Sequence, residues 1–146
     1  MQFSLPGVSV ALADRNRRAR GAWGENYVAA KFQEAGYDVS FARIGERRGD
    51  LCIVDPETGE IYRVEVKTAR RAKDGKWRFT LYKRGHTDHS NADFVVLLAV
   101  LKSGQAVPFV IPYQVLCHQR QAVITSHPEN YSGKLAKYRR RGVIGL

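Results

Sequence analysis

The apolar run FVVLLAVL at 94–101 constrains the fold of this chain more than any other segment. It is far shorter than the roughly 20 residues that a membrane-spanning helix needs, so we interpret it as the strongest core strand of a soluble protein. After the turn SGQ, the apolar segment AVPFVIP at 106–112 pairs back on it. A third run, DLCIV at 50–54, is typical of a strand that is buried on both faces. These runs predict a β-sheet at the centre of the molecule.

Helical and strand patterns alternate along the rest of the chain. Residues 21–35 have helical periodicity, and Gly36 follows them as the expected C-cap. The further expected elements are strands at 37–42, 61–67, 77–82 and 121–125, a short helix from Pro112 over YQVLCH, and helical structure in the tail at 132–141. This order predicts an α/β protein with one mixed β-sheet flanked by helices.

The length of 146 residues suits a single domain. We expect three parts within residues 1–146, namely a basic N-terminal segment at 1–20, a core at 21–125 and a basic C-terminal tail at 126–146. No charged region precedes an apolar stretch at the N-terminus, so a secretory signal is not expected. Cys52 and Cys117 lie in apolar runs and form no CxxC pair, which favours buried thiols in a reducing compartment. We therefore expect a cytoplasmic protein that does not bind membranes.

The charge balance is strongly basic. Lys and Arg number 24 against 14 Asp and Glu, which gives a formal net charge of +10. Such an excess raises the local concentration of polyanions, and nucleic acid is the first candidate. An anionic membrane surface is less well supported, because no basic amphipathic helix stands out. The composition therefore indicates a nucleic acid partner.

Two oppositely charged residues share one face of the predicted strand at 61–67. Because side chains alternate between the two faces of a strand, Tyr62, Val64 and Val66 form the apolar set suited to the core. The other face carries Ile61, Arg63, Glu65 and Lys67. Glu65 and Lys67 then lie side by side, about 7 Å apart along the strand.

The hairpin brings a second carboxylate close to Glu65. The segment DPETGE at 55–60 is a turn by composition, and it centres the hairpin near 57–58. That centre pairs Asp50, which opens the preceding strand, with about position 65. A slip of one residue would turn Asp50 to the other face, so this pairing is the critical expectation.

Two carboxylates held together repel each other unless a cation neutralises them. Their hard oxygen ligands suit Mg²⁺, and Lys67 beside such a metal would orient a water or stabilise charge that develops on a phosphate. The simpler interpretation is a surface ion pair of Glu65 with Lys67 or Arg63.

A further acid lies on the predicted helix. Glu25 shares a stripe with Val28, Ala29 and Phe32 at helical spacing. A carboxylate on an apolar helix face must be protonated, paired or bound to a cation. The alternative is a favourable interaction of Glu25 with the helix dipole near the N-terminus.

In these residues the chain resembles the PD-(D/E)XK nuclease superfamily. The matching features are the helix acid Glu25, the Gly49-Asp50 pair at the start of a strand, and the motif Glu65-Val66-Lys67 on the next strand. The resemblance covers about 21–111, and Gly49 stands where the motif has proline. The pattern looks most like homing endonucleases associated with introns, and archaeal Holliday junction resolvases are nearly as similar.

The resemblance implies a restriction-endonuclease-like fold and hydrolysis of DNA phosphodiester bonds. It implies that Asp50 and Glu65 bind Mg²⁺, or Mn²⁺ in its place, with the Val66 carbonyl as a further ligand. Glu25 would hold a second metal or an ordered water, and Lys67 would position the attacking water. Nucleases that cut both strands need two active sites, so a homodimer or higher homo-oligomer is expected.

Basic residues cluster around the predicted site. The residues that we expect to bind DNA are Arg17, Arg18, Arg20, Arg47, Arg48, Arg70, Arg71, Lys83 and Arg84. A single basic cluster is usually a solvated face, but clusters that flank an acidic pocket suit a protein that must hold phosphates.

Two alternatives remain open from the sequence. The chain could be a non-catalytic basic nucleic-acid-binding module whose acids pair with its arginines, or the catalytic subunit of a larger DNA-processing complex. Between a homing-endonuclease-like and a Holliday-junction-resolvase-like substrate the sequence does not decide.

Overall fold

The structure is a computed structural model, and it describes residues 17–41, 50–81, 92–142 and 144–146. The side chains of Arg17, Arg18 and Asp50 lie outside this description. The expected DNA-binding residues Arg47, Arg48, Lys83 and Arg84 also lie outside it. Within these ranges no helix is both long and apolar enough to cross a membrane.

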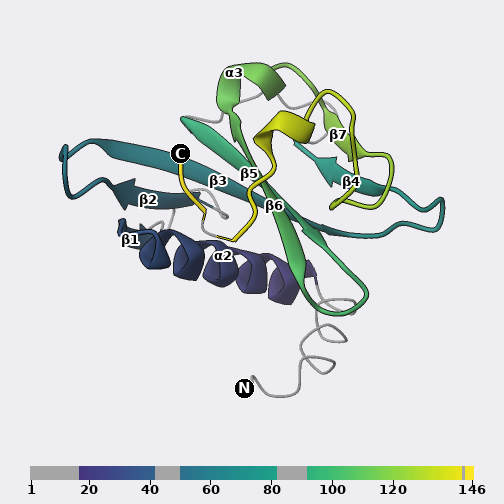
Figure 1. The fold of residues 1–146 in the computed structure, drawn as a ribbon, viewed down its shortest axis with the longest axis horizontal. Coiled ribbons are helices and arrows are strands. Elements are labelled where there is room, and N and C mark those ends of the chain that lie inside the picture. The colour runs from purple at the N-terminus through teal and green to yellow at the C-terminus, as the bar shows by residue number, and fades with distance from the viewer. Residues whose placement is uncertain (1–16, 42–49, 82–91, 143) are drawn as a thin grey trace.

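One long helix, a five-stranded sheet and a small second sheet make up the fold (Figure 1). The elements are α2 (Arg17–Glu34), β1 (Asp38–Phe41), β2 (Asp50–Val54), β3 (Ile61–Arg70), β4 (Trp77–Thr80), β5 (Phe94–Val100), β6 (Ala106–Pro112), α3 (Tyr113–Leu116), β7 (Gln121–Ile124) and the 3₁₀ turn η1 (Ala136–Tyr138). Each expected strand is present. The helix begins at Arg17 rather than Gly21 and ends before Gly36, which takes the positive φ of 98° suited to a glycine C-cap.

The main sheet has the strand order β1-β2-β3-β5-β6. β1, β2 and β3 pair antiparallel, β3 pairs parallel with β5, and β5 pairs antiparallel with β6. The mixed sheet that the sequence predicted is therefore confirmed, together with the hairpin around the turn at 55–60. β3 runs three residues further than expected, because Thr68, Ala69 and Arg70 stay paired with β5.

α2 covers one face of this sheet. The buried apolar side chains between the helix and the sheet are Val28, Ala29, Phe32, Leu51, Ile53, Val64, Val66, Val96, Leu98, Val110 and Ile144. Close contact is possible because Gly24 has no side chain where the helix crosses β3, beside Thr68. The stripe predicted from Val28, Ala29 and Phe32 is the core face of the helix.

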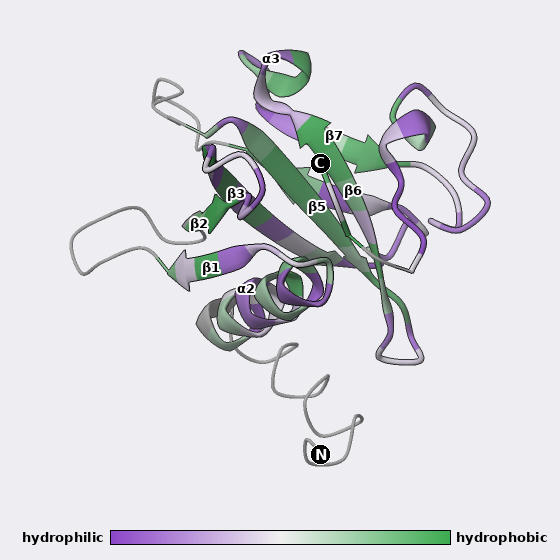
Figure 2. Cartoon of the chain, turned by 60° about the vertical axis from the view of Figure 1, so that its left-hand side comes forward, coloured by the Kyte–Doolittle hydropathy of each residue, from purple (hydrophilic) through white to green (hydrophobic). Residues whose placement is uncertain are grey.

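β4 and β7 cover the opposite face as a separate two-stranded sheet. This corrects the expectation that all strands join one sheet. Trp77 and Phe79 are buried and alternate with exposed residues, so the apolar face of β4 packs on β5 and β6 instead of extending the main sheet. The Trp77 indole N–H donates to the Val100 carbonyl at 2.9 Å. Figure 2 shows the apolar central strands β5 and β6 between the two layers.

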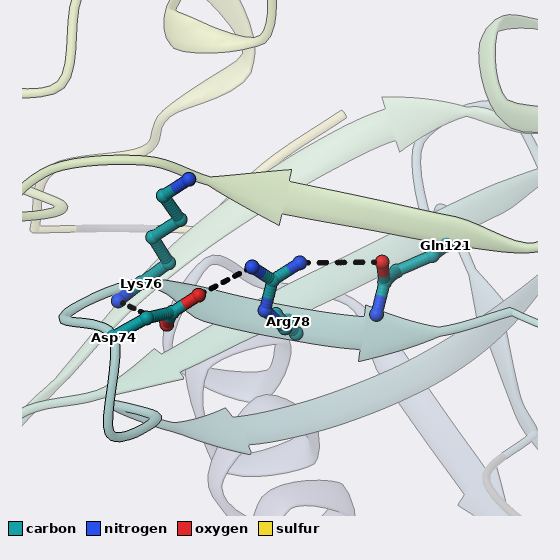
Figure 3. Close-up of polar contacts among 4 residues, drawn as sticks. All are labelled: Asp74, Lys76, Arg78 and Gln121. Atoms are coloured by element: carbon teal, nitrogen blue, oxygen red, sulfur yellow. Dashed lines mark hydrogen bonds and ion pairs between the residues drawn. The ribbon is translucent and has the colours of Figure 1, made fainter.

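An exposed polar bridge ties this small sheet together (Figure 3). Arg78 on β4 pairs with Asp74 in the preceding turn, and its guanidinium lies 3.5 Å from the side-chain oxygen of Gln121 on β7. The hydrogen bond from Arg78 holds the pKa of Asp74 below its usual range, and the Lys76 backbone N–H adds to the effect. The bridge therefore links the turn, β4 and β7 on the solvent side.

The C-terminal segment is part of the packed domain rather than a basic tail. Tyr131 and Leu135 are buried in the cluster under β4 and β7, whereas Ile144 is buried in the cluster under α2. Arg139 forms a β-bridge with Phe109 at the edge of β6, and its guanidinium donates to the carbonyls of Pro128 and Tyr131. The segment thus passes along the outer edge of β6 and contributes to both layers.

This packing corrects the expectation of helical structure at 132–141. Helical structure is limited to the single turn Ala136–Tyr138, because the chain must stay extended to follow β6. The arginines of this segment also bind their own backbone: Arg140 donates to the carbonyls of Gly145 and Tyr138, and Arg141 to that of Glu129.

The helix–sheet contact at Gly24 can be tested by substitution. A Cβ atom at position 24 would lie 1.9 Å from the Thr68 hydroxyl, so Gly24→Ala should destabilise the protein by about 1–3 kcal/mol in chemical denaturation. Gly21→Ala is the matched control, because a Cβ there meets nothing within 4 Å, and it should stabilise the helix by about 0.5–1 kcal/mol. Equal stabilities of the two variants would contradict the close packing.

The insertion of Ile144 gives a second stability prediction. Ile144 is fully buried, so Ile144→Ala should lower the free energy of unfolding by about 2–5 kcal/mol. Leu146 is 37% exposed, and Leu146→Ala should change it by less than about 0.5 kcal/mol. A negligible effect of both substitutions in a thermal melt would show that the segment does not hold the layers together.

Candidate functional site

Glu65 is the buried charged residue of the described chain. It lies in the middle of β3 and only 6% of its surface is exposed. The alternation predicted from the sequence holds: Val64 and Val66 face α2, so Glu65 belongs to the opposite face. A carboxylate in this setting needs a counter-charge, because its desolvation is costly.

Lys67 supplies that charge. Its Nζ lies 3.2 Å from a carboxylate oxygen of Glu65, and its side chain is 30% exposed. The ion pair that the sequence offered as the simpler interpretation is therefore formed, but around a buried acid rather than on a solvated surface. The Lys67 side chain is therefore partly exposed to solvent, whereas the Glu65 carboxylate is buried.

Asp50 lies directly across the ladder from Glu65. The predicted pairing of these two positions is thus confirmed at the level of the backbone. The Arg63 carbonyl accepts from the Asp93 backbone N–H, so odd-numbered residues of β3 direct their backbone groups toward β5. Asp50 and Glu65 are then a non-hydrogen-bonded antiparallel pair, the type in which opposing residues approach most closely.

The Val66 carbonyl points to the other edge of β3. By the same alternation, residue 66 directs its backbone groups toward the β2 side, immediately beyond the Asp50–Glu65 pair. In the described part of β2 the pairing with β3 covers 61–65, whereas β5 pairs as far as Arg70. The Val66 carbonyl therefore lies next to the Asp50–Glu65 pair, on the β2 side of β3.

Glu25 approaches from a different layer. It lies on α2, is half-buried, and follows Gly24, which packs beside Thr68 of β3. The helix covers the face of Val64 and Val66, so the structure does not put Glu25 on the same face as Glu65 and Lys67.

These oxygen donors suit a divalent cation of the Mg²⁺ type in their chemistry. One buried carboxylate, that of Glu65, and one backbone carbonyl, that of Val66, are held by the middle of β3. No group of three His, Cys, Asp or Glu side chains gathers for metal binding in the part of the chain that the structure describes, which leaves out the Asp50 side chain. The carboxylate, carbonyl and ammonium groups are compatible with a metal-assisted hydrolytic centre.

The predicted DNA-binding residues in the described chain lie on α2 and near the end of β3. Arg17, Arg18 and Arg20 belong to the first turn of α2, and Arg20 is half-buried. Arg70 ends β3 and is half-buried, whereas Arg71 is exposed.

Asp93 was not among the residues predicted for the site. Its carboxylate accepts from the Arg63 backbone N–H at 2.8 Å, and its own N–H donates to the Arg63 carbonyl at 2.8 Å. Its carbonyl accepts from the Tyr113 N–H at the start of α3. Asp93 thus fixes the backbone two residues before Glu65. The sequence feature that could have indicated this role is the position of Asp93 directly before the apolar run FVVLLAVL.

The same fold occurs in a bacterial homing endonuclease, I-Ssp6803I, with a TM-score of 0.64. The alignment covers 85% of this chain and 87% of that chain at 19% sequence identity. No protein-family model and no curated protein sequence matches the chain. The structural similarity confirms the expected restriction-endonuclease-like α/β fold, which the resemblance to PD-(D/E)XK nucleases implied.

The burial of Glu65 predicts that Lys67 contributes more to stability than a lysine in a surface ion pair. Lys67→Met leaves a buried carboxylate without its partner and should cost about 1–3 kcal/mol at neutral pH. Adding Glu65→Gln should recover much of that loss in a double-mutant cycle measured by denaturation. Lys31 is the matched control: its side chain is also 30% exposed, but it pairs with exposed Glu34, so Lys31→Met should cost less than about 0.5 kcal/mol. Equal costs for the two lysines would contradict a buried ion pair.

Proposed function

We propose that this protein is a metal-dependent DNA endonuclease. The observation that carries the proposal is the buried Glu65, paired with Lys67 and directly opposite Asp50, in a fold shared with a homing endonuclease. A mere surface ion pair needs neither the burial of the acid nor a second acid across the ladder. The net charge of +10 suits a polyanionic substrate.

In this proposal Asp50 and Glu65 hold Mg²⁺, or Mn²⁺ in its place, with the Val66 carbonyl as a third ligand. When bound, the cation would activate water and offset the charge that develops on the phosphate. The Lys67 ammonium would donate to the attacking water or to a phosphate oxygen. Glu25 would hold a second cation or an ordered water.

Cutting both strands of a duplex requires two such centres, so we propose a homodimer or a higher homo-oligomer on DNA. The preferred DNA is either a long recognition sequence, as for homing-type enzymes, or a four-way junction, as for resolvase-type enzymes. A panel of plasmid, duplex, flap and junction substrates separates the two.

The central test compares cleavage by the wild type and two variants with Mg²⁺ or Mn²⁺. Glu65→Gln and Lys67→Met should each lower the cleavage rate by at least about a hundredfold, because each removes a group that acts in the transition state. Both variants should still bind DNA in a gel-shift assay with Ca²⁺. Glu57→Gln and Lys102→Met are controls at exposed turn positions and should cut like the wild type.

The same preparations give a readout that does not depend on turnover. Mn²⁺ at a concentration of about a hundred times Kd should stabilise the wild type by about 2.7 kcal/mol in thermal melts, and should not stabilise Glu65→Gln. Cutting by Glu65→Gln at the wild-type rate would overturn the proposal. If the wild type binds DNA but cuts no substrate with any divalent cation, a nucleic-acid-binding module is the better description. Cleavage that appears only with an added protein would identify a catalytic subunit.

A further inference from the structure

Among the residues that the structure describes, only part of the sheet face that carries Glu65 is covered. β4 and β7 pack over the later part of β3 and over β5 and β6, where Ala69, Val95 and Leu97 are buried. The rows nearer the β2–β3 turn differ: Ser40 and Ile61 are exposed, and Cys52 and Arg63 are half-buried. Figure 1 shows β4 and β7 at the opposite end of β3 from the β2–β3 turn. Glu65 and Lys67 therefore lie at the boundary between the covered and the open part.

Arg63 stands on the open side of this boundary. It is two residues before Glu65 on the same face, about 7 Å along the strand, and Lys67 is equally far on the other side. Its partner across the ladder is Cys52, in the same close type of pair as Asp50 with Glu65. Two cationic side chains thus flank the buried acid along one line of β3.

The backbone at Arg63 is unusually well fixed. The Asp93 carboxylate accepts from its N–H and the Asp93 N–H donates to its carbonyl, both at 2.8 Å. A residue held on a strand in this way positions its side chain more reproducibly than a loop residue does. Lys67 and Arg63 also differ in chemistry: the Lys67 ammonium lies 3.2 Å from Glu65, and the guanidinium of Arg63 has the planar geometry that can bind two phosphate oxygens at once.

The formal charges in this part of the sheet are nearly balanced. Asp50, Glu65 and Asp93 contribute three negative charges, and Arg63 and Lys67 contribute two positive charges. A divalent cation would leave this group with an excess of one positive charge, which attracts a phosphodiester. DNA binding at these residues should therefore be strengthened by divalent cations, while the basic residues elsewhere act without them.

We infer that Arg63 binds a DNA backbone phosphate adjacent to the one that is cut, so that the strand runs over the open face of β2 and β3 beside Cys52. This inference rests on the proposed function and adds a substrate-positioning residue that the motif does not include. Arg63 acts in binding and alignment, and the chemistry stays with Glu65, Lys67 and Asp50.

Substitution of Arg63 tests the phosphate contact. Arg63→Gln should weaken binding of a short mixed-sequence duplex with Ca²⁺ by about 10-fold to 100-fold and lower the salt slope of log K by about one. It should raise KM for plasmid cleavage with Mn²⁺ more than it lowers kcat. Arg63→Lys keeps the positive charge but not the bidentate geometry of the guanidinium. It should therefore restore the salt slope and recover only part of the affinity.

Lys102→Gln is the charge-matched control, because it also removes one positive charge but lies in the exposed turn between β5 and β6. It should leave affinity and salt slope within about twofold of the wild type. If Arg63→Gln matches Lys102→Gln in affinity, slope and KM, the inference is wrong. A fall in kcat alone, with affinity and slope unchanged, also overturns a phosphate contact. Equal melting temperatures of the variants confirm that folding is preserved.

Cys52 provides an independent measurement of where DNA lies. The chain has two cysteines, so in a Cys117→Ser background Cys52 is the single thiol. Saturating duplex with Ca²⁺ should slow its alkylation by N-ethylmaleimide at least about fivefold if DNA covers the open face. An unchanged alkylation rate at full occupancy would show that DNA binds elsewhere.

The outcomes separate this inference from the proposed function. If the wild type cuts DNA, Glu65→Gln does not, and Arg63→Gln cuts with unchanged KM, the endonuclease stands and only the role of Arg63 fails. If neither variant differs from the wild type in binding or cleavage, both fail.

Discussion

The parallel pairing of β3 with β5 is the constraint on which the rest of this structure depends. It joins the N-terminal three-stranded meander to the β5–β6 hairpin, and a parallel pair requires a connection that leaves the sheet and returns. Here that connection includes β4, which with β7 supplies the second covering layer. Because both faces of β5 and β6 are covered, their side chains are buried almost throughout, and the middle of the neighbouring β3 is buried with them, so an ionised group there must be compensated locally.

That requirement explains the form of the candidate site. Glu65 is tolerated in the middle of β3 because Lys67 lies on the same face and can reach both the acid and the solvent. The ion pair is a modest contribution to stability at best, since desolvation offsets much of the Coulomb attraction. Well-packed apolar residues in place of the ion pair would avoid this desolvation cost.

The elements that were predictable from the sequence were those governed by local rules. Hairpin counting placed Asp50 opposite Glu65 because the turn at 55–60 is short and the two strands alternate regularly. The helix stripe was predictable for the same reason. The partner of β4 was not, because alternation in WRFT indicates an apolar face but not the surface on which that face packs. The burial of Tyr131 and Ile144 was not predictable, because the arginine-rich composition near the C-terminus resembles that of a solvated tail. The face of the sheet on which Glu25 lies depends on how α2 crosses the sheet, and helical periodicity in the sequence does not specify that crossing.

Burial of Ile144 beside Val28 also bears on how the molecule folds. The α2 layer is completed only when residues from opposite ends of the described chain meet, and the parallel β3–β5 pair likewise joins segments separated by a long connection. Such non-local contacts raise the contact order, because large loops must close before the contacts reward them. We therefore expect a slow-folding domain in which the helix and the β2–β3 hairpin form early. The C-terminal segment along β6 should dock late, and its contacts should mainly slow unfolding.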